Sequence, residues 1–538
     1  MGKKIIVLIV LSLVVISLSA IVYINNNYIN NMSSMNTNNI SKNGYEDSNK
    51  DKNVMTLSTH KYAENIVNPK PGQPIKKFEL LSIENTIEIK NGVYRKVWAY
   101  NGTVPGKEIR VNQGDFVEVT LKNILPDPVT IHWHGYPLNS AMDGVPGVNQ
   151  DAIKQGESFT YKFSADVAGT YWYHTHQQGS SQVDKGLYGA LIVEQKDVDK
   201  PDKDFTLMID EWTEKEDGME SMDSMDSMGD SNSAEKFKTA EEASLEEEES
   251  MKEMYNIYTV NGKSGSLIEP LSVAVGDVVK LRFINVGYRS HTVHIPDTNI
   301  KVVSSDGQEI NGAQVIKDKL INISPGERYD IEFSVENNKG FYIDFHDGNL
   351  YNDQIKIPVY VDGKTENVAV EKPVELQQID FTNYGIPSED SFTLDQKYNQ
   401  EFNIDLGIKL NDGSLRYTLN GQTFDKLPSL KLNEDDLIKL TYINNSNVDH
   451  PMHLHGHFFQ IIAKNGKPVT GATLSKDTLL IKPNESYTIA FKADNPGSWV
   501  QHCHELHHAA GGMMQKVEYL GFKSKYVADP NNTFNNPE

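Results

Sequence analysis

The chain contains the same pattern three times, at intervals of about 160 residues, and this repeat restricts the possible folds more than any other feature. One element is an Asn-Gly pair flanked by apolar runs. Its asparagines lie 160 and 159 residues apart, at Asn101, Asn261 and Asn420. A second element is a strand-like run that ends in a histidine, at His176, His346 and His504. Two independent elements at near-constant spacing indicate three tandem domains of one kind.

Apolar and polar residues alternate within each copy. The segment "QGESFTYKFSADVAGTYWYHTH", for example, places Phe159, Tyr161 and Phe163 on one side of an extended chain, as in a half-buried strand. Short strands of this kind, separated by turns, predict an all-β protein made of three tandem Greek-key β-sandwiches. The predicted domains and the tail after them are residues 66–200, 201–370, 371–525 and 526–538.

The N-terminal residues 1–24 carry two lysines followed by an apolar run over residues 5–24. A run of this length is enough to cross about 30 Å of hydrocarbon. Ser19-Ala20 is a weak cleavage site, so we expect an uncleaved membrane anchor, with a cleaved signal peptide as the alternative. In either case the protein is predicted to lie outside the cytoplasm, anchored or secreted. Residues 25–65, rich in Asn and Ser, are predicted to form a flexible tether.

Residues 213–254 break the strand pattern of the second copy and are interpreted as an insertion. The stretch from Glu211 to Glu253 holds 16 acidic residues and four lysines, so it carries about half of the net charge of −23. That charge argues against a nucleic-acid partner. The segment also contains six methionines: Met219, Met222, Met225, Met228, Met251 and Met254. Because little else nearby is apolar, we do not expect them in a core. Thioethers suit Cu(I), so the insertion either binds additional Cu(I) or is a plain acidic loop.

Ten of the 16 histidines fall in four short clusters. They are His132 and His134; His174 and His176; His450, His453 and His455; and His502, His504 and His508. All four clusters contain His-x-His within strand-like sequence, where side chains at i and i+2 share one face. One such pair is weak support for a metal site. Four clusters at matching places in the repeat favour metal binding over an accidental pattern.

The only cysteine, Cys503, lies between two of these histidines in "HCHELHHAAGGMM". A single cysteine excludes an intramolecular disulfide. On a strand, Cys503 faces away from His502 and His504, so its sulfur serves one site and the flanking imidazoles serve another, a few covalent bonds away. His508 and Met513 follow at intervals of five residues. With a histidine from the preceding cluster they give a His₂Cys set plus a thioether, the composition of a blue copper site, whereas zinc favours a closed set of four ligands.

These clusters resemble those of the multicopper oxidases, a laccase-like family of three cupredoxin domains, and the resemblance runs from about residue 75 to 525. It implies four copper ions in three kinds of site. The type 1 copper would be bound by His450, Cys503, His508 and Met513, with Met514 as the less favoured axial ligand. The type 2 copper would be bound by His132 and His453. The binuclear type 3 pair would be bound by His134, His174, His176, His455, His502 and His504.

The resemblance also implies which histidines do not bind copper. His457 occupies a position where the family commonly has a histidine that is not a ligand, and His507 is expected to pack or to form hydrogen bonds. His60 lies in the tether, and the sequence around it gives no indication of a copper ligand. The middle domain has no His-x-His and no cysteine, and is predicted to be a copper-free spacer that keeps His291, His294 and His346.

In the activity that the resemblance implies, electrons pass from a reducing substrate through Cys503 to three coppers between the first and third domains, where dioxygen is reduced to water. Protons are needed as well. Asp143 in "SAMDGVPG" matches the acidic residue that the family has near the first His-x-His, although an Asp before Gly is also a common turn former. Many relatives have another acidic residue directly after the position of His508. This chain has Ala509 there, and Glu505 is the candidate to replace it.

The methionine-rich insertion resembles segments of bacterial cuprous oxidases, so Cu(I) is the favoured reducing substrate, oxidised to Cu(II) in copper tolerance. The alternatives are a laccase-type oxidase of phenols and aromatic amines, a ferroxidase and a manganese oxidase. A copper-free envelope protein or a passive copper store ranks lower, because all ten clustered histidines and the cysteine are present.

Overall fold

A computed structural model describes residues 68–214, 239–347, 350–351, 355–363, 376–388, 391–411, 413–529 and 532–538. The predicted anchor and tether, His60, and the four methionines between residues 219 and 228 lie outside these residues. No helix in the described ranges is both long enough and apolar enough to span a bilayer.

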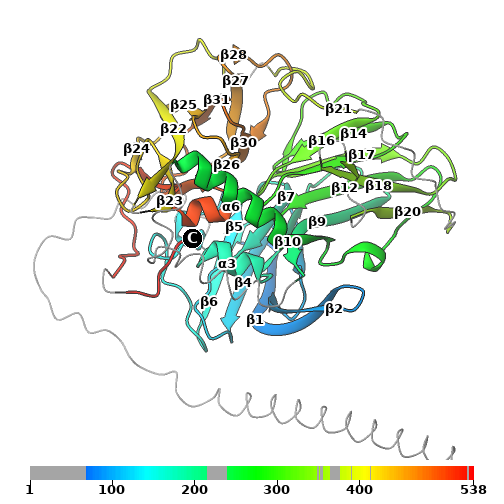
Figure 1. The fold of residues 1–538 in the computed structure, drawn as a ribbon, viewed down its shortest axis with the longest axis horizontal. Coiled ribbons are helices and arrows are strands. Elements are labelled where there is room, and N and C mark those ends of the chain that lie inside the picture. Colours follow the sequence, from blue (N-terminus) through cyan, green and yellow to red (C-terminus); the bar gives the residue numbers. More distant parts are fainter. Residues whose placement is uncertain are drawn as a thin grey trace, which may run out of the picture. The chain divides into compact units, whose positions relative to one another are not determined.

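The prediction of an all-β protein built from three sandwiches is confirmed, because the described strands form six sheets, two in each repeat (Figure 1). In the first repeat the sheet orders are β2-β1-β4-β6 and β3-β8-β7-β5. The strands are β1 (Ile75–Lys90), β2 (Val93–Tyr100), β3 (Gly106–Asn112), β4 (Phe116–Asn123), β5 (His132–His134), β6 (Ser158–Ser164), β7 (Gly169–His174) and β8 (Tyr188–Glu194).

The second repeat has the sheet orders β10-β9-β12-β17-β14-β15 and β11-β20-β18-β13-β16-β21, with β19 beside β18. The strands are β9 (Lys203–Thr213), β10 (Tyr255–Val260), β11 (Leu271–Val273), β12 (Val278–Asn285), β13 (His291–His294), β14 (Ile300–Ser305), β15 (Gln308–Glu309), β16 (Lys319–Ile323), β17 (Arg328–Ser334), β18 (Phe341–Asp347), β19 (Leu350–Tyr351), β20 (Ile357–Val361) and β21 (Gln377–Gln378).

The third repeat has the sheet orders β23-β22-β25-β31-β27-β28, with β29 beside β27, and β24-β33-β32-β26-β30. The strands are β22 (Gln400–Asn411), β23 (Ser414–Leu419), β24 (Leu430–Leu432), β25 (Leu437–Asn444), β26 (His450–Leu454), β27 (Phe459–Lys464), β28 (Lys467–Pro468), β29 (Ser475–Lys476), β30 (Thr478–Ile481), β31 (Ser486–Lys492), β32 (Ser498–Cys503) and β33 (Met514–Tyr519). The helices of the described chain are η1 (Ser140–Met142), α3 (Gly179–Asp184), α6 (Ala240–Met254), η2 (Gly265–Leu267) and α7 (Leu506–Ala510).

The repeated Asn-Gly pairs form the same turn in every domain. They follow β2, β10 and β23, and their asparagines have φ of 57°, 51° and 51° at Asn101, Asn261 and Asn420. Asparagine tolerates this left-handed conformation, and Asn-Gly is the preferred pair for tight hairpin turns. The three side chains also accept equivalent backbone hydrogen bonds, from the N–H groups of Leu81, Met208 and Asp405. The repeat seen in the sequence is therefore a structural repeat.

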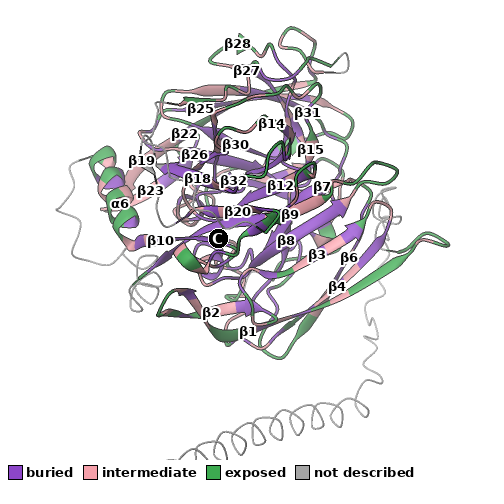
Figure 2. Ribbon diagram, turned by 90° about the vertical axis from the view of Figure 1, so that its right-hand side faces the viewer, coloured by how far each residue is buried: buried purple, intermediate pink, exposed green. Residues whose placement is uncertain are grey.

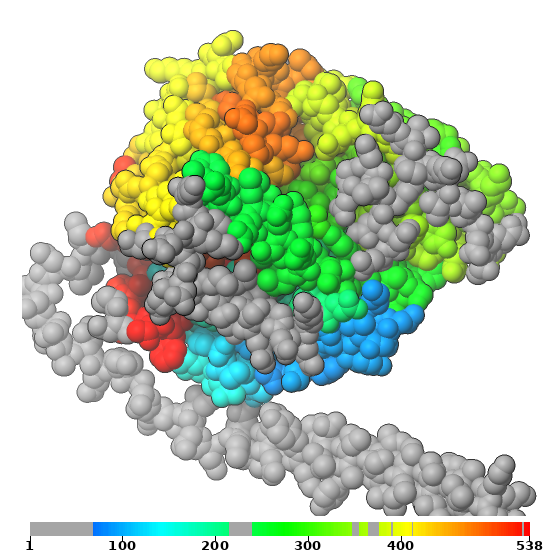
Figure 3. All heavy atoms as spheres, viewed as in Figure 1, coloured from blue at the N-terminus to red at the C-terminus, as the bar shows by residue number. Residues whose placement is uncertain are grey.

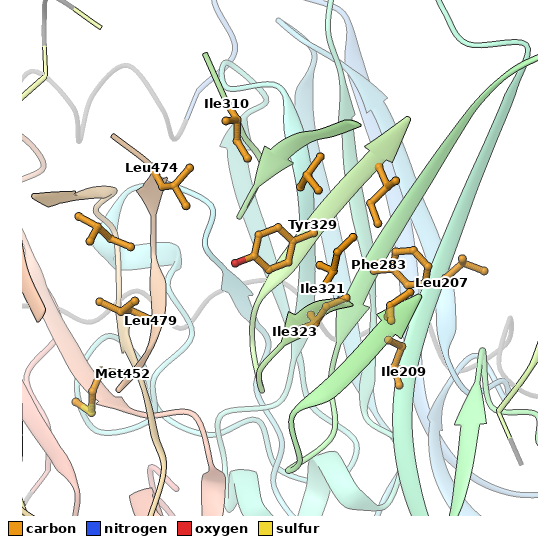
Figure 4. Close-up of a cluster of buried hydrophobic side chains, with 14 of the residues drawn as sticks. Leu207, Ile209, Phe283, Ile310, Ile321, Ile323, Tyr329, Met452, Leu474 and Leu479 are labelled. Atoms are coloured by element: carbon orange, nitrogen blue, oxygen red, sulfur yellow. The ribbon is translucent and has the colours of Figure 1, made fainter. Parts of the chain in front are cut away.

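Alternating sequence gives one buried face per strand. Strand β25 is the clearest case, because Ile438, Leu440 and Tyr442 are buried and the residues between them are partly exposed. One hydrophobic cluster continues from the second domain into the third (Figure 4). In that view Ile321 and Tyr329 come from the second domain, and Met452, Leu474 and Leu479 from the third. Shared burial of this kind fixes the two domains against each other.

The helix α6 occupies the end of the predicted insertion and packs against β10, β22 and β23 (Figure 1). Thr239 caps it by accepting a hydrogen bond of 3.1 Å from the N–H of Glu242. One side of the helix is exposed and the other is buried (Figure 2). Met251 is only 5% exposed and packs against Tyr255. The expectation that the insertion's methionines lie outside any core is therefore wrong for Met251, because the helix folds it onto the second domain.

Candidate metal centres

Strand β32 ends at Cys503, whose sulfur faces two imidazoles. The Sγ atom lies 3.7 Å from Nδ1 of His450 and 3.6 Å from Nδ1 of His508. His450 begins β26, and His508 lies in α7, which follows β32 after a short turn. All three side chains are buried. We refer to His450, Cys503 and His508 as the sulfur site.

The two methionines after α7 pack in different places. Cys503 donates a backbone hydrogen bond of 3.0 Å to the carbonyl of Met513, and the N–H of Met513 donates one of 3.0 Å to the carbonyl of His508. Met513 belongs to the same hydrophobic cluster as Cys503. Met514 instead belongs to a separate small cluster with Val145, Val148 and Val500. Met513 is thus the methionine that accompanies the sulfur site.

The histidines flanking Cys503 serve a different group of side chains. In the register of β26 and β32, His453 lies opposite His502. In the first domain, β5 and β7 pair in a similar way, with His132 opposite His174. Ligand atoms of His176, His455 and His502 lie within 4.8 Å of one another, while Cys503 groups with His450 and His508. The alternation expected of an extended chain therefore separates the sulfur from its neighbouring imidazoles.

Eight buried histidines from the first and third domains converge at this second place, which we name the histidine cluster. Its members are His132, His134, His174, His176, His453, His455, His502 and His504. Two stacked pairs join the domains. The ring centroids of His132 and His455 are 3.9 Å apart, and those of His134 and His453 are 3.8 Å apart. His504 completes the group, with its ring centroid 4.7 Å from that of His134.

Burial favours the neutral form of most of these imidazoles. It lowers the pKa of seven cluster members: His134, His174, His176, His453, His455, His502 and His504. It also lowers the pKa of His450 and brings that of His508 to about 4. Neutral imidazole is the form that binds metal ions. Burial raises the pKa of the Cys503 thiol well above its usual range, so a thiolate at this position needs a nearby cation.

Several buried ring nitrogens of the histidine cluster have no protein hydrogen-bond partner. Among the described residues they include Nε2 of His132, His174 and His453, and Nδ1 of His134. The other ring nitrogen of each of these histidines is held by a protein group. A buried polar atom without a partner is rare, and a bound metal ion would satisfy these lone pairs. The imidazole donors of the cluster and the nitrogen and sulfur donors of the sulfur site both suit copper.

Asp143 lies between the two domains of the cluster. One of its carboxylate oxygens is 3.1 Å from Nδ1 of His132, and the other is 2.9 Å from Nδ1 of His455. The residue is 1% exposed. Outer carboxylates of this kind fix the orientation and tautomer of metal-binding histidines. The fold therefore brings Asp143, a candidate from the sequence, to the histidine cluster.

Asp477, just before β30, also reaches the cluster, and no sequence motif marks it. Its Oδ1 lies 3.2 Å from Nε2 of His134 and 3.4 Å from Nδ1 of His453. Arg328, at the start of β17 in the second domain, donates two hydrogen bonds of 2.7 Å to the Asp477 carboxylate. Burial acts to raise the pKa of Asp477, but the Arg328 guanidinium and His453 together outweigh it and hold that pKa below its usual range. The second domain thus contributes Arg328 to the surroundings of the cluster.

Glu505 faces the sulfur site and not the histidine cluster. One carboxylate oxygen accepts a hydrogen bond of 2.8 Å from the backbone N–H of His508, and the other lies 2.8 Å from Nδ1 of His507. These two histidines outweigh the effect of burial and lower the pKa of Glu505 to about 2. The suggestion that Glu505 replaces the missing acid beside the cluster is therefore not supported, because α7 turns its side chain the other way.

Other histidines have protein partners in place of metal. His457 has Nε2 2.6 Å from the Tyr519 hydroxyl and Nδ1 2.9 Å from the His455 carbonyl. His291 contacts Glu211 in the middle domain. Within the described ranges, no group of three potential metal ligands includes a histidine of that domain.

Gly144 allows the loop that carries Asp143 to approach β5. It has φ of +83°, and a Cβ atom there would lie 1.8 Å from the carbonyl oxygen of Ile131. We expect Gly144→Ala to push Asp143 away from His132, to lower stability by about 1–3 kcal/mol and to weaken copper loading. Gly156→Ala is the matched control, because Gly156 has the same φ of +83° with no heavy atom within 4 Å of the added Cβ. Thermal unfolding and copper content test the difference; equal effects of the two substitutions would contradict this account.

Comparison with known proteins gives a consistent result over most of the chain. Sequence models described as multicopper oxidase match residues 83–198, 203–358 and 387–520. The chain is 28% identical over 446 residues to a multicopper oxidase named MmcO of Mycobacterium tuberculosis, covering 78% of this chain and 82% of that protein. It is 29% identical over 497 residues to Laccase-2 of Botryotinia fuckeliana, covering 81% of each chain.

A solved structure with the same fold is that of Fet3p, described as a multicopper oxidase that functions in iron import. The TM-score is 0.67 at 21% identity, covering 85% of this chain and 93% of that one. The family matches span all three domains, and the site geometry provides nitrogen and sulfur donors suited to copper. The chain belongs to the multicopper oxidase family and is a copper-dependent oxidoreductase that uses dioxygen as its electron acceptor.

Proposed function

We propose that the sulfur site, with Met513, binds the type 1 copper and that the histidine cluster binds the other three coppers of the family's set. His132 and His453 would hold the type 2 ion, and the remaining six cluster histidines would hold the type 3 pair. The single observation that carries this proposal is the division of side chains along β32. Cys503 groups with His450 and His508, while His502, one residue away, groups with His176 and His455.

Copper at these positions supplies one-electron oxidation of a substrate at the sulfur site and reduction of dioxygen to water at the cluster. The protein's part is to connect the two copper sites and to orient the side chains that bind them. The backbone of Cys503 links the sulfur directly to His502 and His504, which gives electrons a short covalent route. Asp143 contacts His132 with one carboxylate oxygen and His455 with the other. These contacts support a role in orienting the two rings. They are also compatible with the predicted role of Asp143 in proton delivery.

The proposed substrate enters a cavity of about 400 Å³ beside the sulfur site. His508 and His507 line it from α7, and helix α6 lines it with Glu247, Glu248 and Met251. Helix α6 (green) lies next to the third domain (yellow) on the face shown in Figure 3. Because His508 both lines the cavity and approaches Sγ of Cys503, an electron from a bound substrate has to cross only one imidazole.

Carboxylates outnumber cations in the cavity lining, with Glu247, Glu248, Asp449 and Glu505 against Lys252, Arg289 and His507. Two of its carboxylates have cationic partners: Glu505 lies beside His507, and Glu248 lies 3.7 Å from Lys252. For Glu247 and Asp449 no ion pair occurs within the described residues. Burial raises the pKa of Glu247, and the Glu505 carboxylate raises it further, so negative charges are crowded here. A bound metal cation would relieve that repulsion.

We propose Cu(I) as that cation, because the thioether of Met251 adds a soft ligand to these carboxylates. Fet3p, which has this fold and functions in iron import, supports metal-ion oxidation as the activity. The similarity to a laccase leaves phenol oxidation as the alternative. Oxidation of Cu(I) would serve copper tolerance, in agreement with the predicted location outside the cytoplasm.

Substitutions in α6 test the substrate. We expect Met251→Leu and Glu247→Gln each to raise KM for Cu(I) by about tenfold, the effect of losing roughly 1.4 kcal/mol of binding. Turnover of a simple phenol should change by less than about twofold, because a phenol does not use these ligands. Oxygen consumption with each substrate measures both.

The matched controls are Met254→Leu and Glu249→Gln, on the same helix but outside the cavity lining. They should leave both activities unchanged. Unaltered Cu(I) kinetics in both Met251→Leu and Glu247→Gln, or an equal loss of phenol turnover, would contradict the choice of Cu(I). Replacing residues 215–238 with a short Gly-Ser linker asks separately whether the other methionines contribute.

A further inference from the structure

The last described residues, 532–538, pack beside the histidine cluster. Pro537 forms a β-bridge with Gln177, the residue directly after His176. The N–H of Gln178 donates a hydrogen bond of 2.8 Å to the carbonyl of Asn536, and the N–H of Asn536 donates one of 3.0 Å to the side chain of Gln177. The tail is thus paired with the segment that carries a cluster histidine.

A second set of contacts anchors this tail to the first domain. Asn535 and Tyr526 donate hydrogen bonds of 2.7 Å and 2.8 Å to one oxygen of Asp151, and Asn532 donates a third, of 3.0 Å. The backbone N–H of Ala152 donates one of 2.9 Å to the side chain of Asn535. Three hydrogen bonds to one carboxylate oxygen, with a fourth from the neighbouring residue, fix the direction in which the chain continues toward residue 538.

These contacts place the Glu538 side chain inside the protein, with only 1% of it exposed. Its Oε1 lies 3.1 Å from Nδ1 of His176. Its Oε2 occupies the space over Gly179, where a Cβ atom would lie 2.3 Å from that oxygen. Gly179, the first residue of α3, therefore leaves the room that the carboxylate needs.

The Glu538 carboxylate lies beside His176, a cluster histidine whose ring makes no hydrogen bond to a protein oxygen among the described residues. Six of the eight have a ring nitrogen within hydrogen-bonding distance of a protein oxygen: His132, His134, His174, His453, His455 and His502. His176 and His504 have no such hydrogen bond among the described residues. Neither oxygen of Glu538 has another partner there. A small rotation of the His176 ring or the carboxylate turns the 3.1 Å approach into a hydrogen bond that satisfies both groups.

From this geometry we infer that Glu538 is a positioning residue of the oxygen-reducing site. Its carboxylate accepts the Nδ1–H of His176 and so directs Nε2 of that ring toward copper, as Asp143 does for His132. Residues 532–538 are then an integral part of the copper cluster and not a passive tail. This inference rests on the proposed placement of copper at the histidine cluster.

The test compares copper retention in the full-length, copper-loaded protein. Outer partners of metal-binding histidines typically contribute roughly 10- to 100-fold in metal affinity. We therefore expect Glu538→Ala and Gly179→Ala to release cluster copper at a chelator concentration at least about tenfold lower than wild type. The blue absorption of the sulfur site should stay unchanged in both, and the near-ultraviolet absorption of the coupled copper pair should fall.

Glu538→Gln keeps an oxygen acceptor and should retain copper to within about threefold of wild type. Thr533→Ala, an exposed position in the same segment, serves as the matched control, and thermal unfolding checks that each variant is folded. Retention in Glu538→Ala equal to wild type, or a loss in Glu538→Gln as large as in Glu538→Ala, would overturn the inference. A wild-type protein that holds no cluster copper would instead contradict the proposed function.

Discussion

Cys503→Ser is expected to remove the intense blue absorption and to lower turnover with every reducing substrate by at least about 1000-fold, or roughly 4 kcal/mol of barrier. A serine hydroxyl is a hard, weakly acidic ligand that does not replace a thiolate in a His₂Cys copper site. The histidine cluster should keep its metal, since His502 groups with His176 and His455 and not with the sulfur of Cys503. Metal analysis should therefore show the loss of a single copper ion per chain.

The methionines beside α7 provide a control for this substitution. Met513→Leu should leave the protein blue with a shifted band, because Met513 packs with Cys503. Met514→Leu should leave the spectrum unchanged, because Met514 packs with Val145 and Val500. A Cys503→Ser protein that stays blue and active would disprove the role given to the thiolate.

Arg328→Met is expected to lower stability by about 3–5 kcal/mol and to release copper from the histidine cluster. Arg328 is fully buried. It donates to Asp477 of the third domain and, at 3.1 Å, to the carbonyl of Thr170 in the first. Removing one partner of a buried ion pair leaves an uncompensated charge, which costs about this much. Asp477 would then also lose its fixed position beside His134 and His453. Urea unfolding and copper content measure both effects.

The double variant Arg328→Met/Asp477→Leu separates the two effects. Removing both charges should recover much of the stability, because Asp306, the other buried carboxylate beside Arg328, keeps Lys476 as its partner. Copper loading should remain low, because the outer partner of two cluster histidines is gone. If the free energy of unfolding of Arg328→Met alone stays within about 0.5 kcal/mol of wild type, Arg328 does not stabilise the contact between the domains and the histidine cluster as described.

The features that sequence predicts well are those encoded locally. Alternating residues predict strands, and the Asn-Gly pairs predict turns, because both depend on backbone preferences within a few residues. The same alternation predicts that Cys503 and His502 serve different sites. No distant contact is needed for any of these conclusions.

The features that sequence reasoning missed depend on residues brought together from different domains. Asp477 and Arg328 are 149 positions apart and belong to no recognisable motif. Glu538 reaches His176 only because its chain is anchored at Asp151. Met251 is buried because α6 packs on the second domain, a contact that the acidic composition of the insertion conceals. Polar groups of this kind are selected by tertiary packing, so a single sequence gives no local signal for them.

The central claim is that residues 502–504, where β32 ends, connect two copper centres, with the Cys503 sulfur at one and the two flanking imidazoles at the other. Diffraction from crystals of the copper-loaded protein, with anomalous data collected at the copper absorption edge, tests it directly. We predict one peak within bonding distance of Cys503, His450 and His508, and a separate group of three among the eight clustered histidines. A peak shared by Cys503, His502 and His504, or no ordered copper at either place, would contradict it.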